Sequence, residues 1–417
     1  MTSGTTITCT GDLSSGESID VDGISQIIIE SLTTDTGELE LEQTADTNDD
    51  TTSFTATFDG SSTYGVSNSS GDAIDIDLTA GDGGSHSTTV EGETGFDGHD
   101  AGSVGASSLT ISDAATLTGE TVLSYITTGG EGGTGQESEA SVDEDGQGGA
   151  GGTGGDGGDQ TVSIGSGSIT TMTATDGALI YMSSQAGDGG AGGLGTSVGG
   201  GSKDVTGGDG STGGTGGDVS VDLTFTDTAT ATTEGDSTPT VRVESVAGDG
   251  GDGGDAIGSG STFQTTNGGD GGAGGVGGDV TATLSNVELK TEGDTSSGVF
   301  VRSYGGAGGD GGSASGGTSG SGGGGALGGI SGEVVVEIQG DVTTTGTDSA
   351  GILVHSVGGF AGDGGSSSDT ISSYGASTES GGQAGTAQLT LGSDSTVTTS
   401  GEGAEGLFVQ SLGGGGG

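Results

Sequence analysis

The chain has 417 residues, of which 105 are glycine and only 26% are hydrophobic, so it lacks the apolar content of a conventional globular core. Its 60 acidic residues against 4 Lys and Arg give a formal net charge of -56, which disfavours binding to nucleic acid and to anionic lipid, because both require cations against phosphate. Cys9 is the single cysteine, which excludes an intrachain disulfide framework.

Residues 1–72 are expected to form a β-rich N-terminal segment, since they lack the glycine-rich tracts that dominate the rest of the chain. The residues after Met1, TSGTTITCTGD, show neither the basic nor the apolar stretch of a signal peptide. No apolar run approaches the roughly 18 residues that a spanning helix needs. We therefore expect no membrane insertion of this segment, and the ending SLGGGGG at Gly417 indicates a fragment of a longer protein.

Residues 73–417 repeat a pattern of about 48–61 residues that is truncated at the C-terminus. Each repeat opens with a short stretch, and in nearly every copy its first and third residues are apolar, the period of a strand with one buried face. The fifth residues of these stretches, with the first stretch counted from Ile74, mark the repeat at positions 78, 126, 184, 245, 303, 356 and 411. The stretches are AIDIDL from Ala73, VLSYI from Val122, IYMSS from Ile180, VRVES from Val241, VFVRS from Val299, ILVHS from Ile352 and LFVQS from Leu407.

Two further strand-like stretches follow each glycine-rich excursion, for example VVVEI from Val334 and the Thr-rich DVTTTG from Asp341. One such coil cannot bury its apolar residues alone, but stacked coils share a continuous narrow core. Low hydrophobicity with high charge is otherwise typical of disorder. The repeat instead predicts an all-β fold, a solenoid of stacked parallel strands.

The excursions contain paired glycine tracts with another residue at every third position, as in GGDGGAGGVGGD at Gly268–Asp279. A polyproline-II-type helix has three residues per turn, so this pattern predicts two bare glycine edges and a packed edge formed by Asp270, Ala273, Val276 and Asp279. Ordering a 12-residue arm alone costs on the order of 12 to 24 kcal/mol. We therefore expect either a bundle of polyglycine II arms stacked by the solenoid, which Gly274→Val disrupts, or mobile loops, which it leaves unchanged.

The segment from Ile330, ISGEVVVEIQGDVTTTGTDSAGILVHSVGGFAGDGG, resembles the passenger repeats of bacterial autotransporter-type large surface adhesins. The resemblance rests on a GDV-T-G turn, a strand ending in Ser and a glycine-rich burst. It extends to GEGAEGLFVQSLGGGGG at the C-terminus and back to about Val122. It implies a right-handed parallel β-helix that is exported to the cell surface.

The second position of the opening strands is expected to face outward, yet it is often apolar or aromatic. This column predicts a surface that another part of the molecule covers, with an exposed stripe or a partner surface as the alternative. Its members are Leu123, Tyr181, Phe300, Leu353 and Phe408, with Arg242 as the exception.

Asp249, Asp252, Asp255 and Asp270 are candidate calcium ligands, because their tracts resemble the calcium-binding nonapeptide repeats in which carboxylates supply hard oxygen ligands. The Thr runs at 343–345 and 398–399 leave ice binding open as well. We expect no enzyme, since His86, His99 and His355 are scattered, and His355 occupies a variable surface position. No cofactor other than calcium is expected.

These features predict an extracellular structural or adhesive repeat region, a rigid stalk or fibre at a bacterial cell surface. Its expected partners are a host or neighbouring cell surface, glycan or matrix. The alternatives are a self-assembling extracellular filament subunit and a calcium-binding or ice-binding repeat protein. The acidity suits a saline setting, where salt screens self-repulsion.

Overall fold

The computed structural model describes residues 5–12, 17–33, 38–59, 64–67, 71–92, 94–111, 115–141, 144–165, 171–174, 177–197, 203–259, 263–369 and 371–417. These residues form an all-β structure without a helix, so none of them belongs to a helix that could cross a membrane. Their strands stack in four sheets, and the pairs between successive repeats are parallel. The predicted all-β class with stacked parallel strands is confirmed.

The strands that precede the glycine tracts form one sheet, with nine strands among the described residues. Its alternation follows the sequence, since Val299 and Val301 are buried while Phe300 between them is only half-buried. The strands are β2 (Glu17–Asp20), β4 (Leu39–Thr44), β7 (Ile74–Thr79), β11 (Leu123–Thr128), β16 (Ile180–Gln185), β20 (Val241–Val246), β24 (Val299–Tyr304), β28 (Ile352–Val357) and β33 (Leu407–Leu412).

The strands that follow the tracts, together with the Thr-rich stretches, form a second sheet with thirteen described strands. They are β1 (Thr5–Asp12), β3 (Ile24–Thr33), β5 (Phe54–Asp59), β6 (Tyr64–Ser67), β9 (Ser107–Ile111), β10 (Ala115–Gly119), β14 (Gln160–Gly165), β15 (Thr171–Ala174), β19 (Val219–Thr233), β23 (Val280–Thr291), β27 (Val334–Thr344), β31 (Ala387–Leu391) and β32 (Thr396–Thr399).

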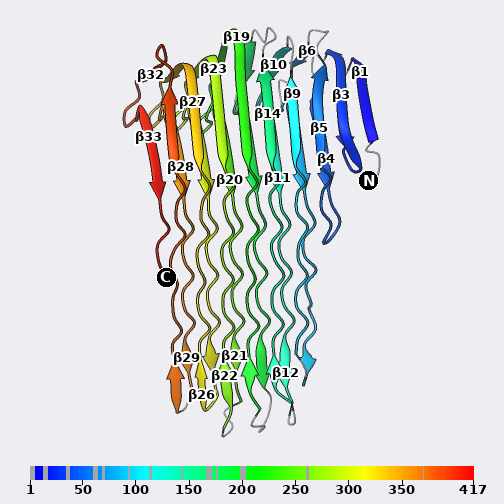
Figure 1. Cartoon of the computed structure of the whole chain (residues 1–417), viewed down its shortest axis with the longest axis vertical. Coiled ribbons are helices and arrows are strands. Elements are labelled where there is room, and N and C mark those ends of the chain that lie inside the picture. Colours follow the sequence, from blue (N-terminus) through cyan, green and yellow to red (C-terminus); the bar gives the residue numbers. More distant parts are fainter. Residues whose placement is uncertain are drawn as a thin grey trace.

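Two small sheets lie at the far ends of the glycine tracts, and Figure 1 shows the long tracts running side by side between them and the large sheets. One contains β8 (Val90–Glu91), β12 (Ser138–Ala140), β17 (Gly195–Ser197), β21 (Ala256–Ile257), β25 (Ala314–Ser315) and β29 (Ser367–Ser368). The other contains β13 (Gly146–Gln147), β18 (Val205–Thr206), β22 (Thr265–Asn267), β26 (Ser319–Ser321) and β30 (Ser372–Tyr374).

A single elongated hydrophobic cluster joins the two large sheets from Val21 to Val354. Each strand contributes only a few residues, such as Val334, Val336 and Ile338 of β27. Stacking therefore supplies a core to a chain of low hydrophobicity. The largest fully buried side chain is Tyr125, whose hydroxyl donates to that of Ser107.

The strand register corrects two details of the predicted repeat. Leu123 pairs with Ile180 and is buried, so it faces the core rather than the outward column, and the repeat marker is Thr127 instead of Ile126. The second and third stretches are not separate in the central repeats, since β19, β23 and β27 each run through both of them. A register irregularity in each of two pairs, between Thr224 and Ala229 and between Ser285 and Val287, marks where these long strands change direction.

Both large sheets also include strands from residues 1–72, namely β1 to β6. The boundary predicted at residue 72 separates the part of the sequence without glycine tracts from the part with them, but both large sheets continue across it. The outward column of Tyr181, Arg242, Phe300, Leu353 and Phe408 is half-buried. The glycine tracts leave the sheet at the strand ends and extend away from it, so they do not cover this column (Figure 1).

Candidate functional site: the stacked glycine arms

The glycine tracts occur in pairs, and each repeat projects one such pair from the sheets (Figure 1). In the repeat that begins with β20, an outgoing arm spans residues 247–255 and a return arm spans residues 268–279. The outgoing arm continues from the nine-stranded sheet, and the return arm leads into β23 of the thirteen-stranded sheet. The arms of successive repeats therefore stack in two layers.

Within each layer, one glycine of every triplet binds the equivalent arm of the next repeat. The amide of Gly274 donates to the carbonyl of Leu327 at 3.0 Å, and the amide of Gly250 donates to that of Ala307 at 2.8 Å. These bonds connect return arms to return arms and outgoing arms to outgoing arms. Each layer is thus held together along the stacking direction.

The other glycine of each triplet binds across to the opposite layer. The amide of Gly275 donates to the carbonyl of Gly248 in its own repeat at 2.8 Å. The carbonyl of Gly275 accepts from Gly306, on the outgoing arm of the next repeat, at 3.0 Å. The bonding direction repeats every three residues, so the backbone groups that a solvated loop would leave to water are paired between arms.

This packing excludes side chains at both glycines of a triplet. A Cβ atom on Gly274 would overlap the carbonyl oxygen of Gly306, and one on Gly275 would overlap that of Gly214. At Gly324, which occupies a third position, the nearest atom to a built Cβ is Asp270 Oδ1 at 3.5 Å. The predicted glycine edges are therefore the packed ones, and the predicted packing of the third-position edge is wrong, since Val276 there is 41% exposed.

Aspartates at third positions form ladders along the outer edges of the arms. In these ladders, the Oδ1 atom of an aspartate accepts from the backbone amide of the equivalent residue one repeat later, and this amide has no arm on its exposed side to bind. Asp270 illustrates both ends of such a bond, because its amide donates to Asp209 Oδ1 at 2.9 Å and its own Oδ1 accepts from Gly324 at 2.7 Å. The same bond links Asp188 to Asp249, Asp252 to Asp310, Asp310 to Asp363, Asp159 to Asp218 and Asp218 to Asp279.

The four candidate calcium ligands belong to these ladders. Asp249, Asp252 and Asp255 lie on one outgoing arm, and their Oδ1 atoms accept from residues 307, 310 and 313 of the next repeat at 2.7 to 2.8 Å. Asp270 lies on the return arm of the same repeat. Burial, together with Asp188, raises the pKa of Asp249 above its ordinary value, although the bond from Ala307 opposes this shift. Calcium binding by these residues stays a prediction.

A different group of carboxylates has its oxygens within 4.8 Å of one another among the described residues, namely Glu38, Asp72 and Asp75. They lie beside the N-terminal end of β7, on the outer side of the nine-stranded sheet. Burial raises the pKa of Asp75 to about 6, and repulsion by Asp72 adds to this shift while a bond from Ser124 opposes it. The pKa values of Glu38 and Asp72 are also raised, mainly by burial.

Buried serines attach the return arms to the nine-stranded sheet. Ser303, at the repeat marker of β24, accepts from the amide of Gly332 at 2.9 Å and donates to the carbonyl of Gly278 at 2.8 Å. Ser245 accepts from the amide of Gly278 in the same way. The marker serine thus connects the ends of two successive return arms. The sequence pattern identified these serines but not their function, because the partner amides lie about 30 residues away.

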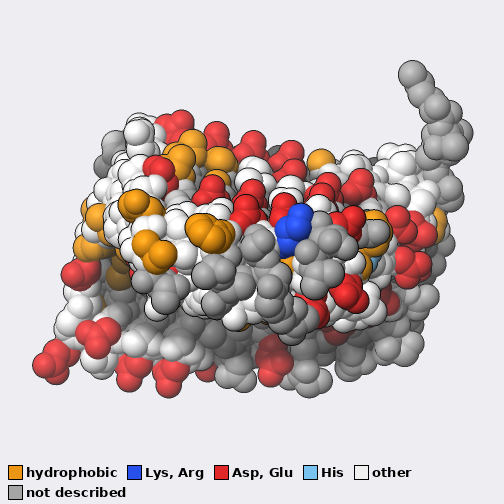
Figure 2. Space-filling model, turned by 90° about the horizontal axis from the view of Figure 1, so that it is seen from below, with side chains coloured by type: hydrophobic (Ala, Val, Ile, Leu, Met, Phe, Trp, Pro, Cys, Tyr) orange, Lys and Arg blue, Asp and Glu red, His pale blue; other side chains and the backbone are white. Residues whose placement is uncertain are grey.

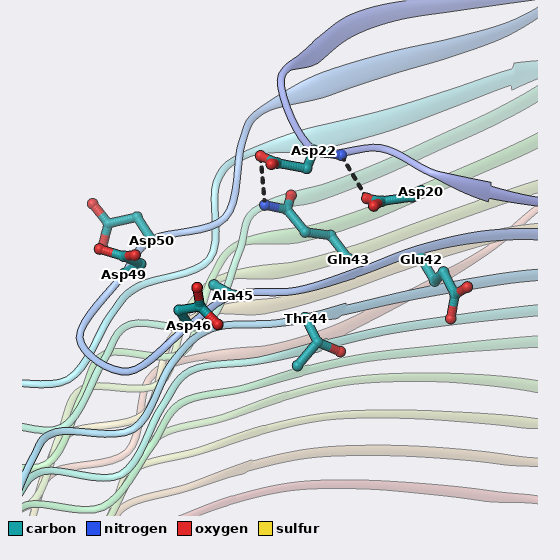
Figure 3. A pocket seen from close by; sticks show the side chains of 9 residues that line it. All are labelled: Asp20, Asp22, Glu42, Gln43, Thr44, Ala45, Asp46, Asp49 and Asp50. Atoms are coloured by element: carbon teal, nitrogen blue, oxygen red, sulfur yellow. Dashed lines mark hydrogen bonds between the residues drawn. The ribbon is translucent and has the colours of Figure 1, made fainter.

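An acidic pocket of about 520 Å³ opens at the N-terminal end of the stack (Figure 3). Gln43 is its central polar residue, since it donates to Asp22 at 3.4 Å and accepts from the amide of Thr52 at 3.0 Å. Around it the carboxylates of Asp20, Asp46 and other residues give the lining a negative charge, which suits cations. Its full lining is Asp20, Asp22, Glu42, Gln43, Thr44, Ala45, Asp46, Asp49 and Asp50.

The three histidines fall into two places. The rings of His86 and His99 lie 5.5 Å apart, and that of Phe96 lies 5.6 Å from His86. His355 is half-buried beside the outward column, and its ring contacts those of Phe300 and Phe408. Its neighbours Arg242, Glu244 and Arg302 form ion pairs that the sequence analysis did not identify, although opposite charges at matching positions of adjacent repeats were the available signal.

The chain matches no protein-family model, no curated protein and no solved structure.

Proposed function

We propose that this chain is an extracellular structural and adhesive repeat region, a rigid stalk or fibre segment at a bacterial cell surface. In this proposal the stacked strands form a right-handed parallel β-helix, and the arms are polyglycine II helices of three residues per turn. The observation that supports it is the pairing of arm amides with carbonyls of neighbouring arms at 2.7 to 3.4 Å, in directions that repeat every three residues.

A structural role follows from how the arms achieve order. Each arm is bonded to neighbours in its own layer and in the other layer, so no arm is ordered alone and every added repeat extends the same two layers. The result is a stiff slab that projects from a narrow core and needs few apolar residues. Such repetition suits a spacer or fibre, whereas catalysis requires one irregular cleft, so we propose a non-enzymatic role.

An adhesive role is supported by the far ends of the arms, which Figure 2 shows from below. Hydrophobic side chains gather toward the C-terminal end of this face, among many acidic ones. Phe263 is 86% exposed and Tyr374 is 63% exposed in the segments that connect outgoing and return arms, where Ile257 and Ile371 are exposed as well. Exposed apolar groups in such a polar surface suit contact with another cell surface, a glycan or a matrix.

Electron microscopy of the purified chain tests the structural part of the proposal. We expect elongated particles of uniform width, with the arms as a lateral slab. Antibodies raised against the purified chain should label intact producing cells, which tests the location. Flexible or irregular particles would contradict the rigid stalk, and labelling that appears only after lysis would contradict the cell-surface location.

A further inference from the structure

The outer face of the nine-stranded sheet changes character along the stack. In β4 and β7, the outward residues include Glu40, Glu42, Asp75 and Asp77. In the later strands the matching positions hold aromatic rings, arginines and a histidine. We name this second part the aromatic–arginine ladder, and its members are Tyr181, Arg242, Phe300, Arg302, His355 and Phe408.

Two of the chain's 4 Lys and Arg residues belong to this ladder, in a chain of net charge -56. Both bind Glu244, which is 2% exposed, with Arg242 Nη2 at 3.0 Å and Arg302 Nε at 2.6 Å from its two carboxylate oxygens. The two guanidinium groups thus share one carboxylate. Both retain exposed surface, so each has donors left for a further hydrogen-bond acceptor.

The planar groups of the ladder contact one another. The guanidinium carbon of Arg242 lies 5.1 Å from the ring centre of Tyr181 and 5.7 Å from that of Phe300. Arg302 lies 5.4 Å from the ring of Phe300, and the His355 ring meets the rings of Phe300 and Phe408 edge-on. These contacts hold the side chains in place before any ligand binds, which lowers the entropy cost of binding.

Stability alone does not account for this arrangement. The buried atoms Arg242 Nε and His355 Nε2 have no hydrogen-bond partner. Glu244 is a buried charge, although it lies on the same sheet face as the acidic side chains of β4 and β7. Each such group costs folding free energy. Burial and the nearby Arg302 lower the pKa of His355, so its ring is neutral in neutral solution.

We propose that the aromatic–arginine ladder binds an uncharged polysaccharide laid across the strands. Tyr181, Phe300 and Phe408 occupy the same position on every second strand. Neighbouring strands are about 4.8 Å apart, so the ladder offers three rings about 10 Å apart, against which the C–H faces of sugars pack. The exposed parts of Arg242 and Arg302 supply hydrogen bonds to hydroxyl groups. A neutral polymer escapes the repulsion that the net charge of -56 imposes on anionic chains. This inference rests on the proposed adhesive function and names its ligand class.

Native gel electrophoresis of the full chain, in gels that contain hydroxyethylcellulose, guar galactomannan or starch, tests the proposal. At least one of these neutral polymers should retard the chain. Phe408→Ala and Arg302→Gln should each weaken the affinity by about tenfold. Phe408 lies on the last strand of its sheet, where no further strand packs beyond it, so we expect the Phe408→Ala variant to fold even if Arg302→Gln does not. Phe360→Ala removes a 63% exposed ring from an outgoing arm, outside both the ladder and the far ends of the arms, and serves as the control that keeps full affinity.

Three outcomes would overturn the proposal. The first is no retardation by any neutral polymer, and the second is retardation by alginate alone, which would indicate a carboxylated ligand. The third is self-association in sedimentation velocity that the Phe408 and Arg302 variants abolish, which would indicate a second copy of the chain. If microscopy shows elongated particles and antibodies label intact cells, but no neutral polymer retards the chain, this inference alone is refuted. Irregular particles, or labelling only after lysis, would refute the proposed function itself.

Discussion

At the scale of single residues, the glycine arms are the most sensitive part of the structure. Gly274→Val places a branched side chain against the carbonyl of Gly306 on the neighbouring arm. We expect this variant to lose about 3 kcal/mol of unfolding free energy or more, because backbone atoms of a packed array cannot move aside locally. Thermal unfolding and amide exchange of the arm glycines measure the effect.

Gly324→Ala is the matched control for this variant. Gly324 occupies a third position on a return arm, its amide still donates to Asp270 after the substitution, and a Cβ atom there meets only an ordinary contact. We expect the unfolding free energy to change by less than about 1 kcal/mol. Equal stability of the two variants would contradict the packing of the arms.

The marker serines give a second test at this scale. Ser303→Ala leaves the amide of Gly332 without its side-chain acceptor in a buried environment, so we expect a loss of about 1 to 3 kcal/mol of unfolding free energy. Ser411 donates to the carbonyl of Gly385, as Ser303 does to that of Gly278, but it lies at the exposed end of the stack, so Ser411→Ala should cost less. Denaturant unfolding of both variants provides the comparison, and a larger loss for Ser411→Ala would contradict the role of burial.

At the scale of elements, the sequence predicted what depends on local periodicity. Alternation identified the strands that precede the arms, and the period of three separated the two glycines of each triplet from the third residue. It could not predict which edge of an arm is packed, because that depends on the arms of adjacent repeats. Nor could it fix the register at Leu123, since VLSYI reads equally well as a strand in either phase. The pairing of Glu244 with Arg302, by contrast, had a signal in the sequence, because the two occupy matching positions of adjacent repeats.

The three carboxylates beside β7 predict a pH dependence of stability. The pKa of Asp75 in the folded chain, about 6, exceeds the usual value of an unfolded aspartate, so the folded state binds more protons between these values. The unfolding free energy should therefore rise as the pH falls from 7 to about 4. Asp75→Asn should raise the melting temperature at pH 7 and flatten this dependence.

Asp77→Asn controls for the loss of one charge from the same strand and the same face. The exposed carboxylate of Asp77 lies outside the cluster of Glu38, Asp72 and Asp75. Repulsion by Asp77 raises the pKa of Asp75 less than burial does, so we expect this variant to keep most of the pH dependence of the unmodified chain. An identical flattening in both variants would show that general repulsion between acidic groups, rather than the buried position of Asp75, causes the effect.

At the scale of the whole molecule, the aspartate ladders have two opposite effects on the stability of the stack. The aspartate ladders satisfy outer-edge amides by placing like charges at the same position in repeat after repeat. The bonds favour stacking while the charges oppose it. The balance depends on the solution, because a carboxylate accepts a hydrogen bond at any ionic strength, whereas repulsion between exposed charges is screened by salt.

We therefore predict that salt stabilises the chain. Raising NaCl from about 10 mM to about 1 M shortens the screening length from about 30 Å to about 3 Å, and we expect the melting temperature to increase by about 5 °C or more. To separate screening from specific binding, the chain is first freed of bound calcium with a chelator, and the effects of calcium and NaCl on its melting temperature are then compared at equal ionic strength. A saturable heat that Asp252→Asn removes would assign the predicted ligands a specific site, whereas equal stabilisation by both salts indicates screening alone. A melting temperature that falls with NaCl would contradict the view that repulsion between the ladders limits the stability of the stack.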